Sequence, residues 1–211
     1  MKIADAYPGR EDGSYTLLFG NIKLGSLISA VHATAIRMGN ELERLVHDRV
    51  VLIDANNLQQ FIDRTLPEGV YVIPKQVLMT DSRLRFDECP DMICVDTKAN
   101  TCLVVELKLG DNFDTKKANG EVNALRRYAA KLNMAIPYRV SYAVCMFTAL
   151  NTQAVIAGFK NRITDREALT GKQFCDLLGI SFPDILMELQ ATQHENVVFL
   201  LKKIKEIEAQ L

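Results

Sequence analysis

Residues 90–108 read PDMICVDTKANTCLVVELK, and this stretch decides how the chain folds. The runs Met92–Val95 and Cys102–Val105 are continuously apolar, which is typical of strands buried in a sheet. Residues 96–101 between them supply the polar and small side chains of a turn. The pattern therefore predicts a β-hairpin.

Three charged side chains stand at the ends of these two strands. Asp91 opens the first strand, and Glu106 and Lys108 close the second. Because side chains alternate along a strand, Glu106 and Lys108 share one face, while Leu107 and Leu109 share the other. An antiparallel strand returns to where its partner started, so Asp91 is expected beside them. Two carboxylates and an ammonium group are thus predicted to converge.

Converging carboxylates repel each other, so a cation is expected between them. A small number of hard oxygen ligands favours Mg²⁺, which completes its shell with water and phosphate oxygens. Lys108 would then orient or help to deprotonate the attacking water, or offset the negative charge on a phosphate. The alternative is a surface hairpin whose Glu106 and Lys108 form an exposed ion pair.

The pattern Pro90-Asp91, fourteen residues, then Glu106-Leu107-Lys108 resembles the motif of the PD-(D/E)XK nuclease superfamily. The resemblance implies a restriction-endonuclease-like fold and Mg²⁺-dependent hydrolysis of a phosphodiester. It also implies that Asp91, Glu106 and the backbone carbonyl of Leu107 bind the metal, while Lys108 acts on the water.

Residues 106–117, which read ELKLGDNFDTKK, are similar to the segment after the active-site lysine in some type II restriction endonucleases. The resemblance covers residues 39–179 loosely and 90–131 well. It implies cleavage of double-stranded DNA at a specific site. The alternatives are a repair or recombination nuclease of the same fold, a catalytically silent DNA-binding protein, and a structural or small-molecule role. The sequence contains no Gly-rich phosphate loop, so no nucleotide cofactor is expected.

An early helix adds a further candidate. Apolar residues recur at threes and fours from Leu27 to about Arg49, which predicts an amphipathic helix. Gly39 predicts that this helix divides there or that something approaches its backbone closely. Glu43 lies at the edge of the apolar stripe. Nuclease families that this sequence resembles often add a glutamate from an early helix to the metal site. Glu43 is the residue that matches this glutamate. The alternative is a glutamate at the boundary of the apolar stripe with no role.

The helix that follows Lys108 is predicted to lie beside the catalytic strand. Its apolar face carries Val122, Leu125, Ala129 and Leu132. The segment that leads into it and its polar face supply candidates for contacts to DNA phosphates or bases. These are Lys116, Lys117, Asn119, Asn123, Arg126 and Arg127. The alternative is an ordinary solvated helix face.

Composition indicates a soluble globular protein. The 211 residues are 48% hydrophobic, enough for one core, and we expect a single endonuclease domain over 1–211. Residues 1–26 would form a loop-rich lead-in, and residues 165–211 would form helices packed on the same domain. With a net charge of −1 the chain is not basic overall, so a protein that binds DNA would have to do so through a local basic groove. The five cysteines lack a Cys-x-x-Cys pair, and no apolar run spans a bilayer, so a cytoplasmic location without membrane contact is expected.

The remaining segments complete an α/β fold with a mixed central β-sheet and helices on both faces. Strands are expected at 15–19, 70–79, 142–147 and 154–159, with a short extension at 83–86. Helices are expected at 54–66, from the capping box at Thr170 to Gly179, from Ser181 onward, and at 195–210. We expect a homodimer, because its two-fold symmetry would match that of a palindromic DNA site. The apolar stripe of the last helix is one candidate interface. The alternative is that this stripe belongs to the core.

Overall fold

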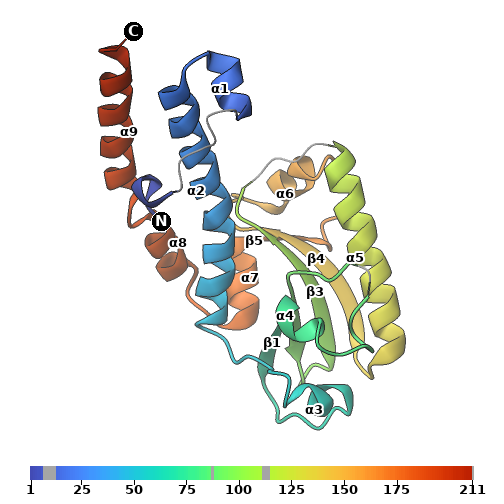
Figure 1. Cartoon of the computed structure of the whole chain (residues 1–211). Coiled ribbons are helices and arrows are strands. Elements are labelled where there is room, and N and C mark those ends of the chain that lie inside the picture. Colours follow the sequence, from blue (N-terminus) through green and yellow to red (C-terminus); the bar gives the residue numbers. More distant parts are fainter. Residues whose placement is uncertain (7–12, 87, 111–114, 211) are drawn as a thin grey trace. The chain divides into compact units, whose positions relative to one another are not determined.

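The computed structural model describes residues 1–6, 13–86, 88–110 and 115–210 (Figure 1). Residues 7–12 of the expected lead-in and residues 111–114 of the segment after Lys108 lie outside this range. Contacts divide the chain into two compact units, one of residues 45–182 and one of residues 1–44 with 183–211. No helix in the described part of the chain is both long and apolar enough to cross a membrane.

The unit of residues 45–182 is built on a five-stranded sheet in the order β1-β2-β3-β4-β5. The strands are β1 (Val70–Pro74), β2 (Met92–Asp96), β3 (Thr101–Lys108), β4 (Arg139–Met146) and β5 (Ala168–Thr170). The pairs β1–β2 and β2–β3 are antiparallel, whereas β3–β4 and β4–β5 are parallel. The predicted hairpin and the mixed sheet are therefore confirmed.

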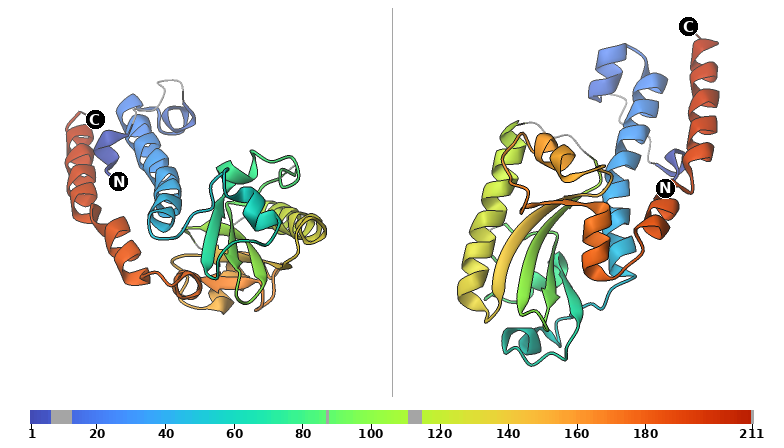
Figure 2. Two further views of the ribbon diagram at one scale, coloured as in Figure 1. Left: turned by 90° about the horizontal axis from the view of Figure 1, so that it is seen from below. Right: turned by 180° about the vertical axis from the view of Figure 1, so that it is seen from behind.

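Helices cover both faces of this sheet (Figure 2). Helix α5 (Thr115–Ala135) buries Val122, Leu125 and Leu132 in one core with Cys102 and Val104 of β3. The opposite face carries the buried Cys145, and α7 (Gly171–Leu178), with its buried Phe174 and Cys175, contacts β4. The α/β prediction with helices on both faces is confirmed for this unit.

Several predicted elements differ from the observed ones. Residues 154–159 form helix α6 (Thr152–Gly158), because the Asn151 side chain accepts a hydrogen bond from the Ala154 amide at 2.9 Å and caps a helix there. The expected strand 70–79 ends at Pro74, and α4 (Lys75–Leu78) follows it. Helix α3 (Leu58–Ile62) is shorter than the expected 54–66, and the extension at 83–86 is not a strand.

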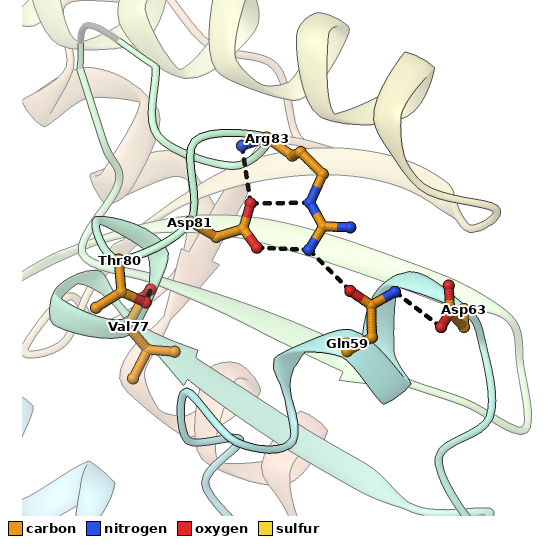
Figure 3. Close-up of polar contacts among 6 residues, drawn as sticks. All are labelled: Gln59, Asp63, Val77, Thr80, Asp81 and Arg83. Atoms are coloured by element: carbon orange, nitrogen blue, oxygen red, sulfur yellow. Dashed lines mark hydrogen bonds and ion pairs between the residues drawn. The ribbon is translucent and has the colours of Figure 1, made fainter.

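Polar contacts fix the segment between α4 and β2 (Figure 3). The Arg83 guanidinium donates to Asp81 at 3.0 Å and 2.6 Å and to Gln59 of α3 at 2.9 Å. The Tyr128 hydroxyl of α5 donates to the Leu84 carbonyl at 2.8 Å. These contacts tie residues 81–84 to α3 and α5.

The capping box predicted at Thr170 is confirmed. The Thr170 hydroxyl accepts from the Gln173 amide, and the Gln173 side chain accepts from the Thr170 amide. Gly179 ends α7 at φ +68°, a left-handed conformation that glycine adopts without a steric penalty.

The unit of residues 1–44 and 183–211 is helical. It contains η1 (Ile3–Asp5), α1 (Ser14–Phe19), most of α2 (Ile22–His47), α8 (Phe182–Gln190) from Pro183 onward, and α9 (Gln193–Glu208). The strand expected at 15–19 is wrong, since those residues belong to α1. The two ends of the chain meet in this unit, where the Ile3 amide donates to Asn196 at 2.8 Å and Lys2 pairs with Glu195 at 2.7 Å.

Helix α2 runs through Gly39 without a break, so the division expected there is wrong. A Cβ built at Gly39 would meet no described atom within 4 Å, so the expected close approach is also not found. Twenty-six residues of continuous amphipathic helix outweigh the cost of one glycine, about 1 kcal/mol relative to alanine.

Candidate active site

The hairpin brings Asp91 and Glu106 to the same end of the sheet. Its register pairs Met92 with Val105, so Asp91 and Glu106 are opposite each other one step beyond that pair. Asp91 Oδ2 accepts a hydrogen bond from the Leu107 amide at 2.8 Å, which fixes this carboxylate against β3. The predicted convergence of the two acidic residues with the end of β3 is confirmed.

Alternation along β3 decides what surrounds these groups. Cys102 and Val104 lie in the core beneath α5, and Glu106 and Lys108 continue the same face. The apolar core therefore ends in polar side chains under α5. Glu106 is 15% exposed and Lys108 is 23% exposed, so the pair is not a solvated surface ion pair.

Lys108 lies among carboxylates. Its Nζ donates to Glu106 Oε1 and lies 3.5 Å from Oε2 of Glu121 on α5. Burial lowers the pKa of Lys108, but the carboxylates around it, Glu106 foremost, outweigh burial, and the pKa lies above its ordinary value. Without a bound metal, the lysine is therefore held as a cation.

The pKa of Glu106 is raised to about 7. Burial raises its pKa, the charge of Asp91 raises it further, and the opposing effect of Lys108 does not cancel this rise. A carboxylate that is costly to ionise in this position would be stabilised by a second positive charge. This observation fits a site for a divalent cation.

The donor set also fits Mg²⁺. The two carboxylates and the Leu107 carbonyl are hard oxygen donors, and Mg²⁺ commonly binds one or two carboxylates while water and phosphate oxygens fill its other positions. In the described part of the chain, no group of three or more His, Cys, Asp or Glu side chains is arranged to hold a metal ion. The protein side chains would therefore supply only part of the metal shell.

Glu121 was not among the residues that the sequence analysis singled out. It lines a cavity of about 190 Å³ together with Glu88 and Glu106. Its neighbours on α5, Ala118 and Val122, are buried against the sheet. The signal in the sequence was its place at the edge of the apolar face of the helix that comes next after β3.

The six candidate DNA contacts all lie on α5. Lys116, Lys117, Asn123, Arg126 and Arg127 are exposed, and Asn119 is half-buried. Arg126 and Arg127 each contact other groups of the protein. Arg126 Nε donates to the Tyr142 hydroxyl at 2.6 Å, and its Nη2 donates to the Arg162 carbonyl at 3.3 Å. Arg127 pairs with the exposed Glu88 at 2.7 Å.

Glu43 lies on α2 and is half-buried. It belongs to the unit of residues 1–44 and 183–211, whereas Asp91, Glu106 and Lys108 belong to the other unit. Its participation in the metal site stays a proposal.

The fold and the site describe an α/β protein with two half-buried carboxylates and a lysine at the end of a sheet, and the chain belongs to the type II restriction enzymes. This is shown by its similarity to the type II restriction enzyme HhaII of Haemophilus parahaemolyticus, which is 37% identical over 217 aligned positions. The alignment covers 98% of this chain and 94% of HhaII. No family model and no solved structure matches the chain.

We predict that Arg126→Ala lowers the thermal unfolding midpoint by a few degrees, equivalent to about 1 kcal/mol, because it removes the bonds that join α5 to Tyr142 and Arg162. Arg127→Ala is the matched control, since its exposed ion pair contributes little. The measurement is thermal unfolding followed by circular dichroism. Equal midpoints for the two variants would show that Arg126 has no structural role.

Proposed function

We propose that this chain is a Mg²⁺-dependent type II restriction endonuclease that hydrolyses double-stranded DNA at a specific site, with Asp91, Glu106 and Lys108 at its catalytic centre. One observation carries the proposal: a half-buried carboxylate pair and a protonated lysine meet at the end of β3. The near full-length similarity to a restriction enzyme supports it. We assign the chain to the PD-(D/E)XK superfamily and its restriction-endonuclease-like fold on the same residues.

Two rival functions fit the site less well. A repair or recombination nuclease would use the same fold, but the similarity along the chain is to a restriction enzyme. A catalytically silent DNA-binding protein would be expected to lose a member of the centre, and Asp91, Glu106 and Lys108 are all present.

The residues of the proposed catalytic centre have different roles. Asp91, Glu106 and the Leu107 carbonyl would hold Mg²⁺, which when bound supplies positive charge to activate the attacking water and to neutralise the phosphate. Lys108 carries a proton at Nζ, so it acts as a hydrogen-bond donor and as a positive charge beside the phosphate. Of the two roles considered for this lysine, the carboxylates around it favour charge stabilisation over proton abstraction.

DNA would be held beside this centre by the exposed face of α5. The proposed contacts are Lys116, Lys117, Asn119 and Asn123. Arg126 and Arg127 are also proposed, and they would have to release their present protein partners to reach DNA. Glu43 is proposed as a further acidic residue of the centre. We also propose that residues 1–211 act as one cytoplasmic endonuclease.

Lys108→Ala is expected to abolish cleavage while leaving folding and most of the DNA affinity intact, because the lysine acts in the chemical step. Glu43→Ala should be milder, within about a few tens-fold of wild type, as for a residue that orients other groups. The measurement is single-turnover cleavage of a plasmid, with fragment ends sequenced to locate the site. Lys98→Ala, in the turn at the far end of the hairpin, is the control. Near-normal turnover of the Lys108 variant would refute the assignment.

Divalent ions should strengthen specific DNA binding as well as permit cleavage, because Asp91 and Glu106 repel a polyanion until they are neutralised. Ca²⁺ offers the same charge with longer bonds and looser geometry, so it should support binding without cleavage, while Mg²⁺ supports both. Asp91→Ala should lose both effects, whereas Asp96→Asn at the other end of β2 should keep them. Gel shifts and cleavage assays in EDTA, Ca²⁺ and Mg²⁺ test this. Full cleavage in EDTA would rule out the metal site.

A homodimer is proposed because one centre cuts one strand, and two centres related by a two-fold axis match a palindromic duplex. Helix α9 presents the apolar side chains Val197, Val198, Leu201 and Ile204, which are between 44% and 55% exposed. The alternative that this stripe is core is therefore disfavoured, and we propose it as the dimer interface.

Leu201→Glu should shift the protein from dimer to monomer, because it places a charge in an apolar interface. Lys202→Glu adds the same side chain next to it on an exposed position and should leave the dimer intact. Light scattering on purified protein, with and without DNA in Ca²⁺, measures the mass. A wild-type monomer under both conditions would contradict the dimer.

A further inference from the structure

The carboxylate of Glu121 faces the lysine of the proposed catalytic centre. Its Oε2 lies 3.5 Å from Lys108 Nζ, and the same ammonium group is hydrogen-bonded to Glu106. Glu121 Oε2 is buried and has no hydrogen-bond partner among the described residues. A buried carboxylate oxygen is costly to leave without a hydrogen bond. The Lys108 ammonium group, 3.5 Å away, is a donor that can satisfy it.

Binding of a divalent cation would change the balance between the two glutamates. Glu106, the carboxylate that Lys108 now contacts, is also a proposed metal ligand. A metal ion on Glu106 and the ammonium group of Lys108 carry like charges and repel each other. Lys108 then needs a second carboxylate that the metal does not use.

Glu121 meets this need without a large rearrangement. Hydrogen bonds between charged nitrogen and oxygen atoms measure about 2.8 Å, so Nζ must move by only about 0.7 Å from its 3.5 Å separation. Glu121 is also held on a rigid element, because Ala118, Val122 and Leu125 of α5 are buried around it.

We propose that Glu121 is a positioning residue for cleavage: it takes over the Lys108 ammonium group from Glu106 when the divalent cation binds, and so holds Lys108 beside the phosphate. The inference rests on the proposed function and deepens it. Glu121 touches neither the metal nor the substrate in this arrangement, and it acts through Lys108.

The test compares Glu121→Gln, which keeps the shape but removes the charge, with Glu121→Asp, which keeps the charge on a shorter side chain. Glu88→Gln is the matched control. It removes the same charge from the same cavity, but its carboxylate contacts Arg127 rather than Lys108. For each variant, kcat, KM and the Mg²⁺ concentration for half-maximal rate are measured on a plasmid with its mapped cleavage site. Ca²⁺-dependent DNA binding and circular dichroism report on folding.

Glu121→Gln should lower kcat by about 10- to 100-fold, with KM, DNA binding in Ca²⁺ and the half-maximal Mg²⁺ concentration unchanged. Glu121→Asp should recover part of the loss, and Glu88→Gln should show none. An unchanged kcat in Glu121→Gln would overturn the inference. So would a loss that excess Mg²⁺ restores, since Glu121 would then be a metal ligand.

Failure of this inference can be told apart from failure of the proposed function. If Lys108→Ala is inactive and Glu121→Gln is fully active, the centre stands and only the role of Glu121 is wrong. If Lys108→Ala cleaves at a near-normal rate, the proposed centre itself is wrong, whatever the behaviour of Glu121.

Discussion

Charge neutralisation at the end of one buried hairpin is the constraint on which the proposed active site depends. β2 and β3 carry apolar side chains into the core beneath α5, and the same face then places Asp91 and Glu106 side by side. Positive charge stabilises this arrangement, because burial and mutual repulsion both disfavour two ionised carboxylates. Lys108 supplies part of that charge without a metal.

Helix α5 covers the hairpin and also carries side chains of the proposed active site. α5 packs Val122 and Leu125 against the sheet, and the same turn directs Glu121 at Lys108. Its outer face carries the basic and amide side chains proposed to contact DNA. The connection of β3 to the parallel β4 needs a crossover, which is usually a helix, and here that helix is α5.

The hairpin and its charged end were predictable because they depend on local rules. Continuous apolar runs mark buried strands, and alternation fixes which side chains share a face. The capping box at Thr170 was predictable for the same reason. Predictions failed where a short apolar segment is compatible with both the strand period and the helix period. Residues 15–19 and 154–159 were expected as strands but lie in helices, and Asn151 caps the second of these helices. The predicted division of the helix at Gly39 was wrong because a single unfavourable residue does not divide a long amphipathic helix.

The sequence by itself determined the hairpin, the identity of Asp91, Glu106 and Lys108, and their convergence, since each follows from period and register within twenty neighbouring residues. Only the tertiary structure decided that Glu121 faces Lys108 and that Arg126 bonds to Tyr142 and Arg162. Both depend on the rotation and position of α5 against the sheet. That placement is set by the packing of buried side chains from distant segments, and no local pattern specifies it.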